Sequence, residues 1–110
     1  MTDRELLEKA AKAAGISLRF IGEQKTPFSD GPGRVGEWNP LTDDGDAFRL
    51  ASNLRLDIAF VGNWSVEVYF LDKIFNKTRF FEEQINEAQD VGPATRRCIV
   101  RAAAAIGEQS

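Results

Sequence analysis

The sequence predicts a single α+β domain over residues 1–110, with a mainly antiparallel sheet of three to four strands packed with three helices. Apolar residues recur at helical spacing near both ends and in the middle of the chain. Residues 55–81 alternate apolar and polar side chains between short turns, which favours antiparallel neighbours. Leu, Ile, Val and Phe supply 29 of the 110 residues, enough for one modest core. The predicted order of elements is α-β-α-β-β-β-α.

The first helix is predicted over residues 2–15. Thr2 and Glu5 have the spacing of a capping box, and Gly15 stands where a helix stops. Residues 16–21 then alternate as a short strand does. Residues 23–41 break the pattern with three prolines and three glycines, and we expect a long irregular loop there. Loops of that length often carry function.

The remaining elements follow from similar signals. A second helix is expected after Thr42 as its N-cap, and three strands are expected to end with residues 74–81. One sheet face is predicted to be core, whereas the other carries charged and aromatic residues, namely Arg55, Asp57, Glu67, Tyr69, Phe75, Lys77, Arg79 and Phe81. Residues 82–91 are expected to connect this sheet to a last helix over about 93–106, which Gly107 ends.

The composition excludes several kinds of site. The chain has no histidine, so a Ser-His-Asp or Cys-His centre cannot be built. Its one cysteine, Cys98, excludes an internal disulfide and a cysteine-based zinc site, and an unpaired thiol fits a reducing compartment. No apolar run approaches the ~20 residues that a membrane span needs. We therefore expect a cytoplasmic protein without membrane contact and without a cofactor.

Residues 38–51, which read WNPLTDDGDAFRLA, resemble a family of small tailed-phage and prophage proteins grouped as the phage ABA-sandwich domain. The stretches 2–7 and 94–104 resemble the ends of the same family. The resemblance implies a layer of helices, a sheet and a second layer of helices. It also implies a phage protein in a bacterial host, and it brings no reaction and no catalytic residues.

Asp43, Asp44 and Asp46 place three carboxylates within four residues. Carboxylates are ligands for Mg²⁺ and Ca²⁺, so these residues are candidate metal ligands. The alternative is a helix start, where acidic side chains are favoured by the helix dipole. An EF-hand loop is absent, because Leu54 stands where it would need a twelfth-position carboxylate. We favour the helix start, because capping residues concentrate at such positions.

The irregular segment contains two candidate binding residues. Arg34 lies in the glycine-rich stretch 29–36, which lacks the Gly-Lys-Ser/Thr ending of a phosphate-binding P-loop. Such a stretch either holds an anion in a backbone nest or is a surface turn. Trp38 either anchors a partner or closes the edge of a small core.

Arginines of the last helix and aromatic residues of the sheet are further candidates. Arg96, Arg97 and Arg101 form a basic cluster that suits a phosphate or carboxylate, or that pairs with surface acids. Tyr69 and Phe81 either lie under covering helices or form an exposed patch for binding. An uncovered patch would favour a two-fold homodimer.

These observations leave three classes of function. The first is a non-enzymatic phage protein that binds a host protein or protein complex, for example as a host-defence or CRISPR inhibitor. The second is a small-molecule binder that sequesters a nucleotide signal. The third is a metal-dependent nuclease acting through Asp43, Asp44 and Asp46. The net charge of −3 argues against non-specific nucleic-acid binding, and we favour the first class.

Overall fold

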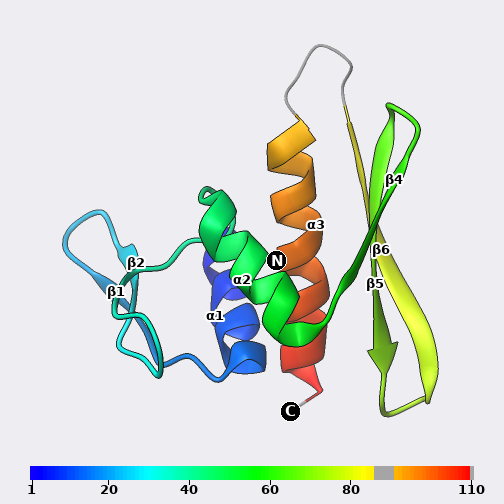
Figure 1. Ribbon diagram of the computed structural model, residues 1–110. Coiled ribbons are helices and arrows are strands. Elements are labelled where there is room, and N and C mark those ends of the chain that lie inside the picture. Colours follow the sequence, from blue (N-terminus) through cyan, green and yellow to red (C-terminus); the bar gives the residue numbers. More distant parts are fainter. Residues whose placement is uncertain (86–90, 110) are drawn as a thin grey trace.

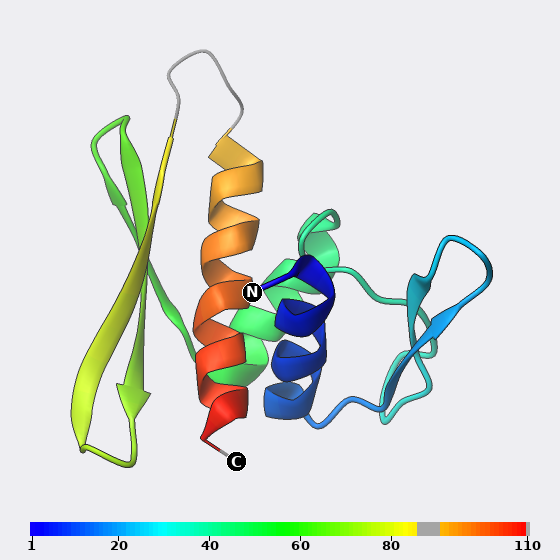
Figure 2. The same cartoon turned by 180° about the vertical axis from the view of Figure 1, so that it is seen from behind.

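The computed structural model describes residues 1–85 and 91–109 and confirms the α+β class. Three helices, α1 (Asp3–Ala14), α2 (Asp44–Leu54) and α3 (Val91–Glu108), lie between two three-stranded antiparallel sheets (Figures 1 and 2). One sheet contains β1 (Leu18–Ile21), β2 (Thr26–Ser29) and β3 (Gly36–Glu37). The other contains β4 (Asp57–Val61), β5 (Ser65–Asp72) and β6 (Lys77–Gln84). No helix in the described part of the chain is long and apolar enough to span a membrane.

The layers differ from those that the resemblance implies. Helix α3 packs on one face of the β4–β6 sheet, and Figures 1 and 2 show no helix of residues 1–85 or 91–109 on the other face. The helices therefore form a central layer with a sheet on each side. In this position α3 is buried on several sides, and its core residues are Cys98, Ile99, Val100 and Ala102 to Ala105.

Helix α1 forms as its sequence predicts. Thr2 caps it, the Glu5 side chain completes the capping box, and Gly15 ends it at φ 72°. The buried side chains of α1 are Leu6, Leu7, Ala10 and Ala11, which face α3 and α2 across short side chains. The two ends of the chain thus build the centre of the core together.

The predicted irregular loop over 23–41 is in part a second sheet. Strand β2 pairs with β1 from Leu18 opposite Ser29 to Ile21 opposite Thr26, and β3 pairs with the far side of β2. Pro27 lacks an N–H, but its carbonyl accepts a hydrogen bond from the Trp38 backbone at 3.1 Å. Pairing with segments on both sides therefore orders a stretch that has almost no periodicity of its own.

Three predicted boundaries shift. The N-cap of α2 is Asp43, whose carboxylate accepts a hydrogen bond from the Asp46 N–H at 2.8 Å, so Thr42 lies outside the helix. Strand β6 begins and ends three residues later than expected, at Lys77 and Gln84. Helix α3 continues through Gly107, because this glycine packs against α1. The rest of the predicted connection, residues 86–90, lies outside the described residues.

The register of β6 also changes which side chains share a face. Arg79 lies opposite Phe70, and Phe81 lies opposite Val68, so both are on the face that α3 covers. Lys77 lies opposite Asp72 on the same side. The interpretation that placed Lys77, Arg79 and Phe81 with Tyr69 on the second face was therefore wrong. The cause is the later start of the strand.

Candidate functional site

The outer face of the β4–β6 sheet is open and acidic. Paired residues of antiparallel strands share a face, so the register of the three strands defines this surface: Asp57, Ala59, Val61, Ser65, Glu67, Tyr69, Leu71, Thr78, Phe80, Glu82 and Gln84. Of these, Ser65 is buried, at 1 % exposed. We call this surface the acidic face. It carries three carboxylates and no Lys or Arg.

Tyr69 and Phe80 form the aromatic centre of the acidic face. They lie directly opposite each other on β5 and β6, and their rings stack with centroids 5.2 Å apart. Phe80 is 53 % exposed. The Tyr69 hydroxyl donates a 2.6 Å hydrogen bond to Glu67. This bond, together with burial and the charges of Glu67 and Glu82, raises the pKa of Tyr69. The phenol therefore stays protonated beside these carboxylates.

Phe81, the aromatic residue singled out from the sequence, points the other way. Its ring lies 6.1 Å from the Phe70 ring, and the Arg101 guanidinium lies 4.8 Å from its centroid. The sequence indicated only that one of the adjacent pair, Phe80 or Phe81, faces away from the core. The register of β6 selects Phe80 for the open face, and the sequence contains no signal that fixes this choice.

A cavity of about 530 Å³ between β3, the glycine-rich stretch and α2 brings together Arg34, Trp38 and Asp46. Trp38 is only 7 % exposed, so it closes the core and forms part of the cavity wall. Asp46 accepts hydrogen bonds from the Asn39 N–H at 2.9 Å and from Arg49 at 2.7 Å. Arg49 was missed from the sequence, although its position three residues after Asp46 on one helix face was a usable signal.

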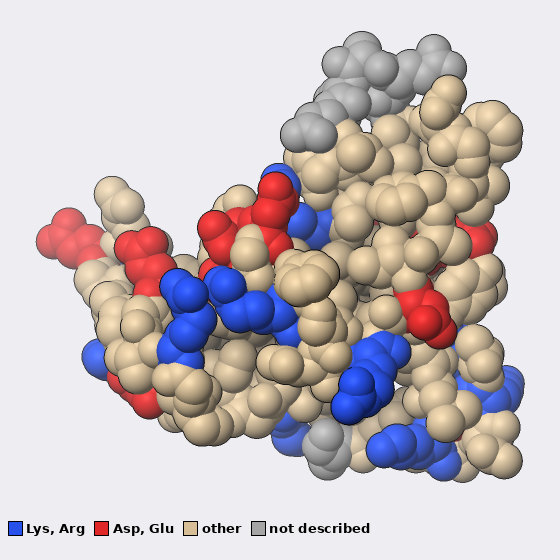
Figure 3. Space-filling model, in the orientation of Figure 1, with Lys and Arg blue, Asp and Glu red and all other residues tan. Residues whose placement is uncertain are grey.

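Arg34 and Glu37 line this cavity without an ion pair to any described residue, and Arg34 is the one that carries a positive charge. It is exposed, and its guanidinium forms no hydrogen bond or ion pair with the described residues. Its carbonyl instead accepts a 3.1 Å hydrogen bond from the Ser29 hydroxyl, which fixes the stretch. Figure 3 shows basic and acidic side chains side by side near α2. The arrangement suits a small anion at Arg34.

The arginines of α3 do not form a cluster. Arg96 donates to the Leu41 carbonyl at 2.9 Å and to Asp44 at 2.6 Å. Arg97 pairs with Asp3 of α1 at 2.9 Å, and Arg101 donates to the Glu82 carbonyl and pairs with Glu83 of β6. Each arginine thus ties α3 to a different neighbour.

Asp43, Asp44 and Asp46 are each engaged by the protein. Asp43 caps α2, Asp44 pairs with Arg96, and Asp46 pairs with Arg49. Among residues 1–85 and 91–109, no group of three His, Cys, Asp or Glu side chains is placed to hold a metal ion. All three carboxylates lie at the start of α2, where the capping of Asp43 and the ion pairs of Asp44 and Asp46 engage them.

Cys98 is buried in the core, as its position on an apolar helix face predicts. Its Sγ donates to the Phe81 carbonyl at 3.1 Å. Burial raises the pKa of the thiol to about 11, so the nucleophilic thiolate is scarce at neutral pH.

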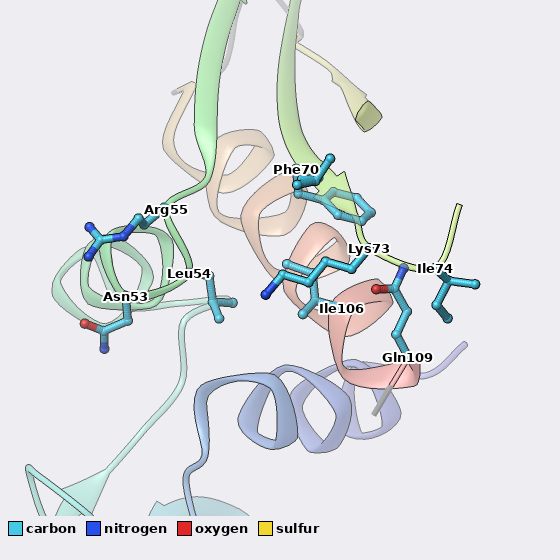
Figure 4. A pocket seen from close by; sticks show the side chains of 9 residues that line it. Asn53, Leu54, Arg55, Phe70, Lys73, Ile74, Ile106 and Gln109 are labelled. Carbon is cyan, nitrogen blue, oxygen red and sulfur yellow. The ribbon is translucent and has the colours of Figure 1, made fainter. Parts of the chain in front are cut away.

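Figure 4 shows a second cavity, about 650 Å³, where the end of α2, the β5–β6 turn and the end of α3 meet. Leu54, Phe70 and Ile106 give it an apolar wall. Lys73 reaches over it, and the buried Nε2 of Gln109 has no hydrogen-bond partner among the residues that the structure describes. No local pattern of the sequence indicates this cavity, because its residues come from three distant segments.

Comparison of the chain with protein-family models, with curated proteins and with solved structures finds no match.

Proposed function

We propose that this protein is a non-enzymatic binding module that docks its acidic face on a basic surface of a host protein or protein complex. The observation that carries the proposal is the open acidic face, with three carboxylates around the Tyr69–Phe80 pair and no basic side chain. Aromatic residues supply most of the affinity in protein interfaces, and charge complementarity supplies specificity and a fast association rate.

A phage origin and a place in the bacterial cytoplasm belong to the same proposal. They rest on the resemblance of residues 38–51 to the phage family and on the single buried thiol, Cys98. A basic channel that binds nucleic acid is the partner surface whose charge best complements the acidic face. Host-defence complexes, including CRISPR effectors, contain such channels, so we assign the protein to the class of host-defence inhibitors.

A site-specific photocrosslinker tests the docking face. Benzoylphenylalanine at position 80 should crosslink a host protein in lysate, whereas the same group at position 75, in the β5–β6 turn, should not. The double variant Glu67→Gln/Glu82→Gln should weaken the captured complex about fivefold, since each exposed ion pair contributes roughly 0.5 kcal/mol. Higher salt should weaken it further, because screening shortens the reach of exposed charges.

The control variant is Glu23→Gln, which removes one exposed carboxylate from the β1–β2 turn, far from the acidic face. It should leave the complex unchanged. Crosslinking from position 75 but not from position 80 would contradict the proposal, and so would a complex that is insensitive to both the double variant and salt. A purified CRISPR effector with its guide RNA provides a direct arm, in which the protein should compete with target DNA.

A second function, sequestration of a nucleotide, is favoured by one observation: the free guanidinium of Arg34 at the 530 Å³ cavity. Nucleoside phosphates, cyclic dinucleotides and ADP-ribose species would be the panel of a thermal-shift assay. A ligand at 100 times its Kd adds about 2.7 kcal/mol, which raises Tm by about ten degrees or more. Arg34→Ala should abolish that shift, whereas Arg4→Ala, on the exposed side of α1, should not. A flat panel would leave the docking proposal as the only one.

A further inference from the structure

Strand β4 is an edge strand without the usual protection. It pairs with β5 on one side only, and no strand in the described part of the chain pairs with its other side. Half of the backbone N–H and C=O groups of such a strand point outward and are ready to pair with another chain. Natural edge strands are normally blocked by charged side chains, prolines or bulges.

The two edges of this sheet differ sharply. Strand β6 reads KTRFFEEQ and carries four charged residues in eight, which blocks that edge. Strand β4 reads DIAFV, and its only charge is Asp57 at the start. Ile58 is 40 % exposed and Phe60 is 57 % exposed, although both are on the face that α3 covers over β5. The helical layer therefore stops short of β4.

Helix α2 extends the same apolar surface. Phe48, which is 72 % exposed, and Ile58 line one cavity of about 330 Å³ beside the start of β4. In Figure 3 the surface over β4, at the upper right, is largely free of charged atoms. Phe48, Ile58 and Phe60 thus form one exposed apolar patch beside the free edge of β4.

We infer that two copies of this chain pair through their β4 edges and form one continuous six-stranded sheet across a two-fold axis. Outward-pointing backbone groups occur on every second residue of the strand. Two identical antiparallel strands can therefore pair only if the two-fold axis lies midway between one residue and the same residue of the second copy. An axis at Ala59 pairs all five residues, with Ile58 opposite Phe60 of the second copy and Asp57 opposite Val61. No charge then faces a like charge, and apolar side chains meet on one face.

The same register would bury the Phe60 side chain against the second copy. It lies opposite Ile58 of the other copy, at the rim of the 330 Å³ cavity, which receives its ring beside Phe48. The exposed parts of Phe48 and Phe60 amount to about 250 Å² per copy, if a phenylalanine side chain buries about 200 Å². A stable interface buries about 800 Å² per partner, with the backbone and rim included. Because the two phenylalanines supply only about a third of that area, we expect a weak dimer with a Kd on the order of micromolar.

The dimer does not depend on the proposed host partner, because it uses the edge of the sheet and leaves the acidic face open. A two-fold axis perpendicular to the sheet keeps both acidic faces on the same side. The pair would thus present six carboxylates on one surface.

Sedimentation velocity of the purified protein, over about two decades of concentration around 10 µM, tests the inference. The wild type should pass from monomer to dimer. Phe60→Lys should raise the Kd about 30-fold or more, as expected for a buried aromatic anchor. Phe75→Lys is the matched control, because Phe75 is 69 % exposed in the β5–β6 turn. It should leave the Kd unchanged.

A disulfide trap tests the register without relying on a destabilising charge. Cα atoms directly opposite in an antiparallel pair are about 4.5–5.5 Å apart, within the range of a disulfide. Ala59→Cys should therefore crosslink to itself under mild oxidation, whereas Thr78→Cys on β6 should not. A protein that stays monomeric throughout, or a dimer that Phe60→Lys does not weaken and Ala59→Cys does not trap, would overturn the inference. If benzoylphenylalanine at position 80 captured no host protein, the inference that the chain dimerises through β4 would be unaffected.

Discussion

Gly107 of α3 lies directly against the backbone of α1. A Cβ placed on it would lie 2.0 Å from the carbonyl oxygen of Lys9 and 2.9 Å from the carbonyl carbon. These are backbone atoms of α1, so no side-chain rotation relieves the contact. We therefore predict that Gly107→Ala destabilises the protein, although alanine is the better helix former by about 1 kcal/mol.

The magnitude follows from the distance. Real Cβ contacts start near 3.0 Å, so α1 and α3 must separate locally by about 1 Å. A gap of 0.5–1 Å forfeits a quarter to a half of each dispersion contact that it opens. The seam consists of buried small residues such as Ala10 and Ala103, which cannot fill the gap. Overpacking typically costs 1–3 kcal/mol, and we expect a net loss of about 2 kcal/mol. That loss lowers Tm by about 10 °C.

Thermal and urea unfolding followed by circular dichroism measure this change. Gly45→Ala is the matched control, because a Cβ there meets only the side-chain ends of Arg49 and Asp43, both at 3.2 Å. These atoms belong to side chains that can adjust by a few tenths of an ångström while they keep their bonds to Asp46, so we expect Gly45→Ala to shift Tm far less. A Gly107→Ala protein as stable as the wild type would refute the reasoning.

Two further predictions concern buried groups. Burial of Asp72 raises the pKa of its carboxyl, but hydrogen bonds from the Phe75 and Ile74 N–H groups and from Arg79 outweigh this and hold it below its ordinary value of 3.8. The ionised carboxylate thus stabilises the protein at neutral pH, and this stabilisation is lost as the pH falls below about 4. In Asp72→Asn, the urea concentration at the unfolding midpoint should therefore decrease less between neutral and acid pH than in the wild type. An equal decrease in the two proteins would count against this role. Cys98, with its pKa raised to about 11 by burial, should react with a thiol reagent at pH 8 far more slowly in the folded protein than in urea, and equal rates would contradict its burial.

Local signals were sufficient for most of the helices and strands. Thr2, Glu5 and Gly15 define α1 through groups that are neighbours in the chain, so the sequence alone predicts both of its ends. Strand β2 was missed because Pro27 argues against a strand and because four residues give too short an alternation. Its order comes from pairing on both sides, with β1 residues that lie 5 to 11 positions earlier in the chain and β3 residues that lie 7 to 9 positions later.

The candidate site was harder to predict because it depends on distant partners. The spacing of Arg96, Arg97 and Arg101 indicated a common basic face, yet their partners Asp3, Asp44 and Glu83 come from three separate elements. The open acidic face depends on the register of β6 and on which face of the sheet α3 covers. Neither is encoded in a local pattern.

The pairing of the first and last helices has a consequence for how the protein folds during synthesis. Helix α1 leaves the ribosome first, but its buried residues Leu6 and Leu7 pack in a layer that α3 completes. At 5–20 residues per second, the chain between the two helices takes about 4–15 seconds to make. Val66 and Val68, which are fully buried in the finished protein, have no helix to cover them during that interval. Contacts across so long a stretch of chain also slow folding. Formation of α3 therefore completes this part of the core. A chain that is truncated before α3 would expose Val66 and Val68 and would be prone to aggregate.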